Sequence, residues 1–514
     1  MAYLMGIDLG TTGARTIIID EKGRLGAAAG VSDYPLYRPH PLWAEQDPSD
    51  WWEGVKASIQ KAFRVSGVKP PDIKGIGLSG QMHGLVLLDA KGAVLRNSIL
   101  WCDQRTGKQC EYIMNKKGKE VVKSTCNPAL TGFTLPKIIW VMKEEPKIFD
   151  KAGMILLPKD YIRFRLTGEF ATEVSDASGT LMLDVKKRKW SEEVLRSFGI
   201  RNEALPSVYE SPEITGEITA EAAEETGLNK GTPVVGGAGD QAASGVGNGI
   251  VRKGLVSSTI GTSGVVFAFL EQPETDPLLR THTFCHAVPG KWHIMGVMLS
   301  AGGSLKWFRD NFASEETVAA KQLGDDPYEL MAKEACVIKP GAEGLIFLPY
   351  LTGERTPYPD PYARGVFFGL TPRHTKAHMI RAVLEGVAFG LRDSLDIIRK
   401  LNIKVGEVRA SGGGGRSGLW RQIQADIFNT EVTSINISEG SAFGAALLAG
   451  AGTGVYGSVE EACEKTIKVV SRSEPDPESV RRYEEYYQIY RSLYPKLKDS
   501  FAQVSKLAEK ADKK

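Results

Sequence analysis

The 514-residue sequence lacks several patterns that would assign it directly to a known class of site. Its six cysteines include no C-x-x-C pair and no spacing typical of zinc ligands, which excludes a cysteine-based metal module. Scattered single cysteines are typical of proteins in a reducing compartment, so we expect a cytoplasmic protein. No run of about 20 apolar residues occurs, and the N-terminus lacks the charged segment of a signal peptide. We therefore expect no membrane partner.

An excess of charge of either sign is also missing. The chain has 64 basic and 62 acidic residues, a formal net charge of +2, which gives no general attraction to nucleic acid. No nucleic-acid partner is expected. The pattern Gly-x4-Gly-Lys-Ser/Thr does not occur, which excludes a P-loop. Any bound nucleotide must therefore be held by other glycine-rich turns.

Two short segments that are present repeat one pattern 251 residues apart. Gly10-Thr11-Thr12-Gly13 and Gly261-Thr262-Ser263-Gly264 each follow an apolar strand and precede a second strand-like segment. Turn N–H groups and hydroxyls of this kind form a cradle for anions such as phosphate. Either segment alone could be an ordinary hairpin turn. The matched pair favours one nucleotide held between two related domains, with Arg15 adding positive charge beside the first turn.

Strand and helix patterns alternate along both halves of the chain, which predicts an α/β fold with a mixed sheet in each half. The length is too great for one hydrophobic core, and we place two domains at residues 1–250 and 251–514. Glycines at 245, 247, 249 and 254 predict a hinge at this junction. After Pro477, tyrosines recur at helical spacing and predict a helix docked on the core, which Pro495 should end or kink.

Two aspartates stand beside glycine-rich turns. Asp8 ends the strand before the first turn, where it could hold Mg²⁺ or accept hydrogen bonds from the turn. Asp240 follows Gly236–Gly239 at the predicted start of a helix. There it could accept the proton of a hydroxyl that attacks a phosphoryl group, or it could be a plain helix N-cap. The glycines favour the first role, because a cap needs none of them.

Three further segments carry candidate binding residues. Gln81-Met82-His83 offers groups that suit a small polyol or sugar, with a buried, hydrogen-bonded histidine as the alternative. Asp103 and Arg105 offer an acid and a base nearby, with a mutual ion pair as the alternative. The glycines from Gly413 to Gly418 match the dinucleotide fingerprint, and a loop that lets an adenosine lie against the backbone explains them equally well. An NAD-dependent dehydrogenase therefore stays open at this point.

Longer motifs together resemble the FGGY family of carbohydrate kinases, over nearly the whole chain from Met5 to about Leu493. They are Gly6–Thr11, His40–Pro48, Gly80–Gly84, Leu157–Tyr161, Gly239-Asp240, Gly261–Gly264, Leu351–Pro357 and Gly412–Gly414 leading to Trp420-Arg421-Gln422. The resemblance implies two ribonuclease-H-like domains of the actin-like ATPase fold, with the active site in the cleft between them. It also implies ATP and Mg²⁺, with Asp240 as catalytic base and Asp8 as the catalytic residue that places the metal.

The resemblance further implies which residues bind each substrate. The sugar would contact Gln81, Met82, His83, Asp103, Asp240 and Gln241. ATP would contact Thr11, Thr12, Arg15, Gly261, Thr262, Gly303, Trp307, Gly413, Gly414 and Gly418.

The expected reaction is phosphorylation of a ketopentose by ATP, with D-xylulose giving D-xylulose 5-phosphate. Glycerol-specific members of the family carry an arginine–acid pair in place of Met82-His83, which disfavours glycerol. Gln241 stands where many D-xylulose-specific members have Asn, which leaves ribulose or another polyol open as the substrate. A non-catalytic ATP-binding protein of the actin fold is a further alternative. The sequence does not determine the oligomeric state, and a homodimer stays open.

Overall fold

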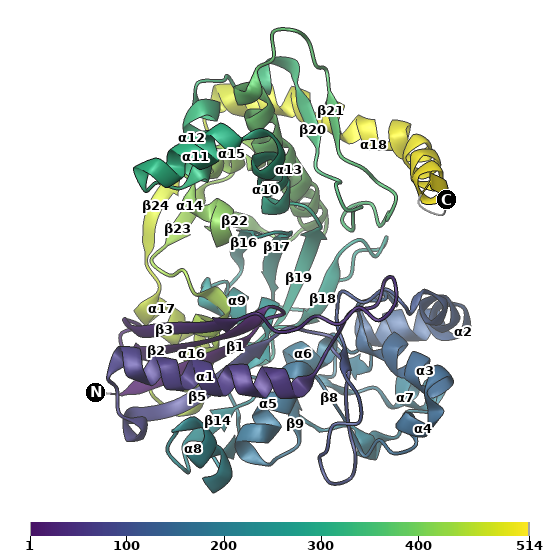
Figure 1. Cartoon of the computed structure of the whole chain (residues 1–514), viewed down its shortest axis with the longest axis vertical. Coiled ribbons are helices and arrows are strands. Elements are labelled where there is room, and N and C mark those ends of the chain that lie inside the picture. Colours follow the sequence, from purple (N-terminus) through teal and green to yellow (C-terminus); the bar gives the residue numbers. More distant parts are fainter. Residues whose placement is uncertain (1, 512–514) are drawn as a thin grey trace.

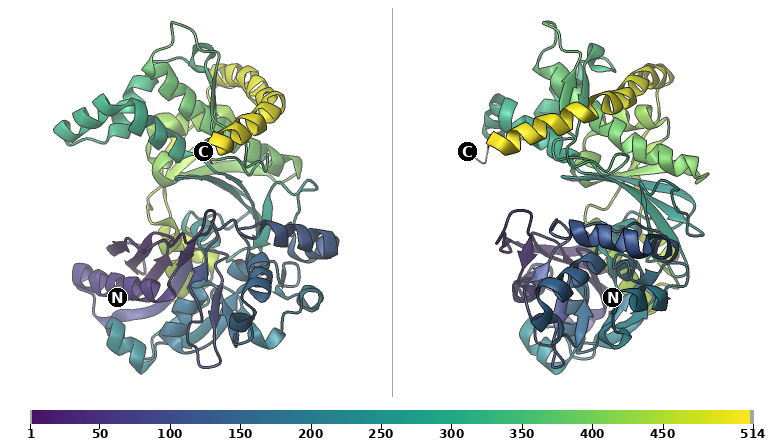
Figure 2. Two further views of the ribbon diagram at one scale, coloured as in Figure 1. Left: turned by 45° about the vertical axis from the view of Figure 1, so that its right-hand side comes forward. Right: turned by 90° about the vertical axis from the view of Figure 1, so that its right-hand side faces the viewer.

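The protein has two lobes, each built on a seven-stranded mixed sheet flanked by helices (Figures 1 and 2). The structure is a computed structural model and describes residues 2–511. In Figure 1 the lower lobe contains the sheet ordered β13-β14-β5-β1-β2-β3, with β15 also paired to β5, and the upper lobe contains β18-β19-β17-β16-β22-β23-β24. These two sheets confirm the α/β prediction.

Both sheets are built around the same arrangement of three strands. In each, a hairpin is followed by a later strand that lies parallel to the first strand of the hairpin. The hairpin strands and the parallel strand are β1 (Tyr3–Leu9), β2 (Gly13–Asp20) and β5 (Ile73–Gly80) in the first sheet, and β16 (Gly254–Ile260), β17 (Gly264–Leu270) and β22 (Val405–Ser411) in the second. The two glycine–hydroxyl turns are therefore the corresponding hairpin turns of two related sheets.

The remaining elements surround these strands. The first half of the chain also contains β3 (Leu25–Ser32), β4 (Glu45–Gln46), α1 (Pro48–Ser66), η1 (Pro70–Asp72), β6 (Val86–Leu88), β7 (Ser98–Ile99), α2 (Gly107–Thr125), α3 (Thr134–Glu144), α4 (Pro146–Phe149), β8 (Met154–Leu156), α5 (Pro158–Thr167), β9 (Ala171–Glu173), α6 (Val174–Ser178), β10 (Leu183–Asp184), β11 (Lys189–Trp190), α7 (Glu192–Phe198), η2 (Asn202–Ala204), β12 (Ser207–Tyr209), β13 (Ile214–Glu217), α8 (Ala220–Thr226), β14 (Pro233–Val235), β15 (Ala238–Gly239) and α9 (Asp240–Gly247). The second half also contains β18 (His282–Cys285), β19 (Trp292–Met298), α10 (Gly302–Phe312), α11 (Ser314–Leu323), α12 (Pro327–Cys336), η3 (Ala342–Gly344), β20 (Ile346–Leu348), β21 (Val366–Phe368), α13 (Lys376–Lys400), α14 (Gly412–Arg416), α15 (Gly418–Phe428), β23 (Val432–Ile435), α16 (Gly440–Gly452), α17 (Val459–Thr466), β24 (Val469–Ser473) and α18 (Pro477–Ala511).

Helix α16 comes from the second half of the chain but packs on the first sheet, against β1 and β5. The packing is so close that a Cβ on Gly6 or Gly77 would overlap backbone atoms of this helix. Gly247 likewise packs on the start of α16, and Gly245 faces Phe267. Both glycines thus lie inside α9 and serve close packing. Gly249 and Gly254 follow this helix with φ values of +68° and +93°, and the hinge at this junction stays a prediction. The division at residue 250 stays a prediction.

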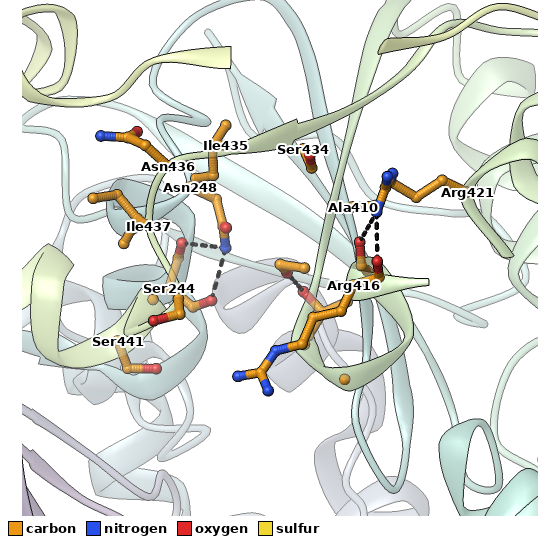
Figure 3. A pocket seen from close by; sticks show the side chains of 17 residues that line it. Ser244, Asn248, Ala410, Arg416, Arg421, Ser434, Ile435, Asn436, Ile437 and Ser441 are labelled. Carbon is orange, nitrogen blue, oxygen red and sulfur yellow. Dashed lines mark hydrogen bonds between the residues drawn. The ribbon is translucent and has the colours of Figure 1, made fainter. Parts of the chain in front are cut away.

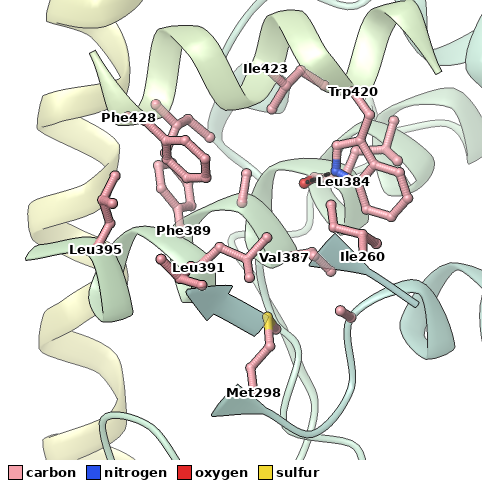
Figure 4. Packing of buried hydrophobic residues seen from close by; sticks show 14 of the residues in the cluster. Ile260, Met298, Leu384, Val387, Phe389, Leu391, Leu395, Trp420, Ile423 and Phe428 are labelled. Atoms are coloured by element: carbon pink, nitrogen blue, oxygen red, sulfur yellow. Dashed lines mark hydrogen bonds between the residues drawn. The ribbon is translucent and has the colours of Figure 1, made fainter. Parts of the chain in front are cut away.

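The core of the upper lobe lies between its sheet and α13 and α15. Figure 4 shows Ile260, Leu384, Val387 and Trp420 packed together there, and all are buried. Helix α18 lies on the same core, because its side chains at Tyr483, Tyr487, Tyr490 and Leu493 are buried. This confirms the predicted docking face. The helix does not end at Pro495, but it bends along its length (Figure 2). Among residues 2–511, no helix is both long and apolar enough to cross a membrane.

Candidate active site

The residues singled out in the first half meet at one edge of the first sheet. Strands β1, β5 and β15 lie side by side and parallel, with Asp8 opposite Ser79 and Gly239 opposite Gly80. Parallel strands end at the same edge, and neighbouring strands are about 4.8 Å apart. The turn after β1, the segment Gln81-Met82-His83 after β5, and Asp240 after β15 are therefore brought together by strand pairing alone.

Asp240 is the first residue of α9 but not its cap. The N-cap residue is Gly239, which has no side-chain hydrogen bond, so the helix-cap alternative for Asp240 is wrong. Burial, and to a smaller extent the negative charge of nearby Asp8, raise the pKa of Asp240 to about 7, while hydrogen bonds from Gln241 oppose this rise. A carboxylate with a pKa near 7 is suited to accept a proton at neutral pH.

Asp8 has the environment expected of a carboxylate that binds a cation. It accepts one hydrogen bond, from Ser79 Oγ at 2.8 Å. Burial raises the pKa of Asp8, although this hydrogen bond and the charge of Arg15 lower it. Its charge also acts on Asp240, whose pKa it helps to raise. One or two carboxylates completed by substrate phosphates are a common protein site for Mg²⁺, so the residues present fit that ion.

Replacing Asp240 with Asn should stabilise the ligand-free protein above pH 7 but not near pH 4. The pKa of Asp240 is about 7 in the folded protein, against an ordinary value of 3.8 in the unfolded chain. Ionisation of this carboxyl therefore destabilises the folded state progressively as the pH rises from about 4 to 7. The linkage gives a ceiling of about 4 kcal/mol, and partial solvent access makes the effect smaller.

Thermal denaturation of both proteins from pH 4 to pH 8 measures this difference. The Tm of the Asp240→Asn protein should exceed that of the parent by an amount that grows with pH and levels off above about pH 7. A difference that stays constant over this range would show that Asp240 does not titrate near 7.

His83 is held in a fixed orientation at the predicted sugar site. Its backbone has a φ of +68°, and its carbonyl accepts hydrogen bonds from Thr134 Oγ1 at 3.1 Å and Lys137 Nζ at 2.8 Å. On its ring, Nδ1 lies 2.9 Å from the carbonyl oxygen of Gly179. Since that oxygen can only accept, Nδ1 carries the proton and Nε2 is left as an acceptor. Burial lowers the pKa of His83 well below its usual range, which keeps the ring neutral.

Met82 lies between His83 and the loop that leads to Asp240. It is buried, and its side chain is so close to Gly239 that a Cβ there would come within 2.9 Å of Met82 Cγ. Any larger residue at position 239 would displace it. The Met82 side chain thus contacts the backbone of the residue that directly precedes Asp240.

Two residues that the sequence assigned to the sugar have other partners. Asp103 is fully buried, accepts a hydrogen bond from the Ala44 N–H at 2.7 Å, and pairs with Arg105 at 2.7 Å. This is the ion pair that the sequence left open, and it does not favour Asp103 as a sugar ligand. Gln81 is buried as well, and its amide is bonded to Gln46 and to the hydroxyl of Thr11. Gln81 therefore links the sugar-side segment to the first glycine–hydroxyl turn.

The first turn itself is only partly as expected. Thr12 is exposed, so its hydroxyl is accessible to a ligand. Thr11 Oγ1 is already bonded to Gln81 and to Trp101 Nε1 at 2.9 Å. Arg15 forms an ion pair with Glu439, which precedes α16. That pair ties the first hairpin to the second half of the chain, and it reduces the charge that Arg15 could offer to a phosphate.

In the second half, the ends of the parallel strands β16 and β22 form the corresponding edge, with Ile260 opposite Gly412. Here a cavity of about 380 Å³ is lined by Gly261, Thr262, Gly303, Gly413 and Gly414, all of which were predicted to bind ATP. Its apolar wall suits a purine base and contains Ile260, Leu305, Met331, Ile380, Leu384 and Trp420. Trp307 and Gly418 do not line this cavity, and the Trp307 ring packs against Phe312 and Phe347 instead.

A second cavity, of about 560 Å³, lies between the two halves of the chain (Figure 3). It is lined by Ser244 of α9 and Asn248 directly after this helix on one side and by the ends of β22 and β23 on the other, and Arg416 extends into it. The glycine segment expected to be a loop forms the short helix α14, and Gly413 lines both cavities. The structure thus has an opening between the edge of the second sheet and α9, the helix that begins with Asp240.

Lys137 escaped the sequence analysis. Lys137 is fully buried and donates to the carbonyls of His83 and of Gly132 at 2.7 Å. Burial lowers the pKa of Lys137 to about 7. The signal for it was a single lysine in the apolar run Leu135–Trp140. Gly179 was missed as well, and no local pattern marks it, although a Cβ there would overlap the ring of His83.

Comparison with known proteins agrees with this geometry. The family model for the N-terminal domain of the FGGY carbohydrate kinases matches residues 3–247, and the model for their C-terminal domain matches residues 256–453. The chain belongs to the FGGY family of carbohydrate kinases. It is a sugar kinase, which excludes the NAD-dependent dehydrogenase considered from the glycine fingerprint.

Individual members of the FGGY family match over nearly their full length. The xylulose kinase of Bacillus subtilis (strain 168) is 39% identical over 499 residues, which cover 97% of this chain and 98% of that protein. The gluconokinase of the same organism is 35% identical over 508 residues, 98% of both chains. The crystal structure of a ligand-bound xylulose kinase from Lactobacillus acidophilus superposes with a TM-score of 0.90 at 28% identity, covering 98% of this chain and 100% of that one. The fold is accordingly the two-domain actin-like ATPase fold of FGGY kinases.

Proposed function

We propose that the protein transfers the γ-phosphoryl group of ATP to the terminal hydroxyl of D-xylulose, giving D-xylulose 5-phosphate and ADP. The observation that carries this proposal is the convergence of Asp240 with Met82 and His83 at the edge of the first sheet. Strand pairing brings them together, and the glycine-lined cavity stands at the corresponding edge of the second sheet. Relatives of nearly equal length that are named xylulose kinases support the choice of sugar.

In this proposal the oxygen of the sugar hydroxyl bonds to the γ-phosphorus while the bond to ADP breaks. Asp240 accepts the proton that the hydroxyl loses. The adenosine lies against Gly413 and Gly414, in the apolar-walled cavity, and the phosphates lie at Gly261 and Thr262. Positioning and fixed dipoles account for most of the catalysis of phosphoryl transfer, and these turns supply both. Asp8 would hold Mg²⁺, which would offset negative charge on the phosphoryl oxygens.

Replacing His83 with Ala should weaken sugar binding selectively. Because Nδ1 is used by Gly179, His83 Nε2 is the ring acceptor left for a sugar hydroxyl, and its loss should leave the nucleotide cavity intact. A hydrogen bond of this kind is worth about 0.5–1.5 kcal/mol, so the KM for D-xylulose should rise by about 2- to 10-fold while the KM for ATP barely changes. Steady-state kinetics measure both constants, with His374→Ala on the upper lobe as the matched control. Equal rises in the two constants would contradict a sugar contact at His83.

The substrate itself is tested by coupled measurement of ADP release with D-xylulose, D-ribulose, gluconate and glycerol. D-Xylulose should give the highest kcat/KM of the four. Gluconate belongs in the panel because a gluconokinase is among the similar proteins. A higher kcat/KM for any of the other three compounds would overturn the choice of D-xylulose, and ATP binding without ADP release on any of the four would favour the non-catalytic alternative.

A further inference from the structure

A cluster of buried charged and hydroxyl side chains lies directly behind the loop that carries Asp240. Lys159, Asp160, Glu173, Ser175 and Asp176 are all fully buried. Lys159 and Asp160 belong to the segment Leu157–Tyr161, which the sequence analysis singled out and to which the proposed function gives no role. Burial of several charges destabilises the folded state unless they are paired and hydrogen-bonded, which suggests that this cluster has a role.

Two members of the cluster hold the backbone of the loop. Lys159 Nζ donates to the carbonyl oxygen of Gly236 at 3.3 Å, and Ser175 Oγ accepts the N–H of Gly239 at 3.1 Å. These two hydrogen bonds hold the two ends of the segment Gly236–Gly239 in place. Gly239 is the residue directly before Asp240, so its N–H bond fixes the point from which the catalytic carboxylate projects.

Ser175 is in turn oriented by Glu173. Its hydroxyl donates to Glu173 Oε1 at 2.9 Å, which leaves its lone pairs for the N–H of Gly239. Glu173 also accepts the N–H groups of Ser175 at 2.7 Å and Asp176 at 2.8 Å, at the start of α6. Its other contact is the hydroxyl of Ser211, which donates to Oε2 at 2.8 Å. Four hydrogen bonds therefore hold the carboxylate of Glu173, which in turn orients the serine that contacts the loop.

The glycines of the loop are required by the same contact. A Cβ on Gly236 would come within 3.1 Å of Glu173 Cβ, a separation that forces one of them to move. Gly237 has a φ of +74°, and a Cβ there would overlap the backbone of Leu78. The glycine run before Asp240 thus lets the loop lie against the buried cluster on one side and against β5 on the other.

We infer that Ser175, oriented by Glu173 and assisted by Lys159, is a positioning residue for Asp240. It touches neither the sugar nor ATP. It fixes the N–H of Gly239 so that the Asp240 carboxylate is aimed at the sugar hydroxyl. This inference rests on the proposed function, because it takes Asp240 to be the base of a sugar kinase.

The test compares two serines that donate to the same carboxylate. Ser175→Ala removes one hydroxyl from Glu173 together with the acceptor for Gly239, whereas Ser211→Ala removes the other hydroxyl and leaves the loop contact in place. A misplacement of a catalytic group by about 1 Å costs up to 10²-fold in rate. We expect Ser175→Ala to lower kcat by about tenfold or more, with the Kd for ATP unchanged, and Ser211→Ala to leave kcat within about twofold of the parent.

Each rate is measured on the sugar that the parent phosphorylates best and is divided by the fraction of protein that binds ATP in calorimetry, so partial unfolding does not enter. Equal kcat values for the two variants would overturn the positioning role. If Ser175→Ala does not fold, Gly236→Ala applies the same test, because its Cβ pushes the loop away from Glu173 and should lower kcat at constant Kd for ATP. A parent that prefers gluconate would refute the proposed substrate, but the ratio of the kcat values of the two serine variants, measured on gluconate, would still test this inference. A parent that phosphorylates no sugar would refute both.

Discussion

Replacing Asp240 with Asn should lower turnover by about 10²–10⁴-fold, because Asn keeps the shape of the side chain but cannot accept the proton of the sugar hydroxyl. The loss should appear in kcat, and the Kd for ATP should be unchanged because the nucleotide cavity lies in the upper lobe. The structure makes this a clean substitution. Asp240 does not cap α9, and burial beside Asp8 makes its charge a cost to the folded state.

Single-turnover phosphorylation with both substrates saturating gives the rate, and calorimetry with ATP gives the affinity. A Tm at pH 8 no lower than that of the parent shows that the variant is folded. Turnover within a few-fold of the parent in such a folded variant would remove Asp240 from the mechanism. A large loss of ATP affinity would instead show that Asp240 supports the nucleotide site.

Replacing Gly261 with Val should weaken ATP binding while leaving the fold intact. A Cβ at Gly261 would meet only the carbonyl oxygen of Ser263, at 3.7 Å, and otherwise open space. The added side chain therefore occupies the cradle rather than the core. Displacing the phosphates from one or two charge-assisted hydrogen bonds, each worth about 1.5–3 kcal/mol, should raise the Kd for ATP by on the order of 10- to 10⁴-fold.

The matched control is Gly107→Val. Gly107 also has open space at its Cβ, but it lies at the start of α2 in the other lobe. Calorimetric titration should show weakened ATP binding for Gly261→Val and parent-like binding for Gly107→Val, with similar Tm values for both. Unchanged affinity in folded Gly261→Val would refute the assignment of this turn to phosphate.

The sequence could predict the part of the site that depends on strand ends. Asp8 lies at the end of an apolar strand, and Asp240 and Gly261 each follow one. Parallel strands bring such residues to one edge of their own sheet without further information. The paired glycine–hydroxyl turns also revealed that the two halves are related. These inferences succeed because a short segment contains both the strand and the residue that follows it.

The sequence analysis missed partners that come from distant parts of the chain. Arg15 pairs with Glu439, and Gln81 is bonded to Gln46 and Thr11, so neither side chain is free as its local context suggested. Gly245 lies in a helix whose packing against Phe267 is invisible until the lobes are assembled. The passage of α16 back onto the first sheet likewise has no local signal, because glycines and alanines suit any close contact.

Lys137 and Ser175 were missed for a related reason. Each acts on a backbone group of another segment, and a backbone carbonyl or N–H leaves no trace in the residue types around it. A lysine in an apolar run could have drawn attention to Lys137. Nothing in the sequence marks Ser175 apart from other serines near a helix start.

The reaction proposed for this protein is transfer of the γ-phosphoryl group of ATP to D-xylulose. Phosphorus NMR of the purified protein with ATP, Mg²⁺ and D-xylulose tests it most directly. We expect the γ-phosphoryl signal to disappear while signals of ADP and of one phosphomonoester appear in equal amounts. The phosphorus of this ester should be coupled to the protons on C5 of the sugar. Formation of inorganic phosphate without a sugar ester, or of an ester only when another sugar replaces D-xylulose, would contradict it.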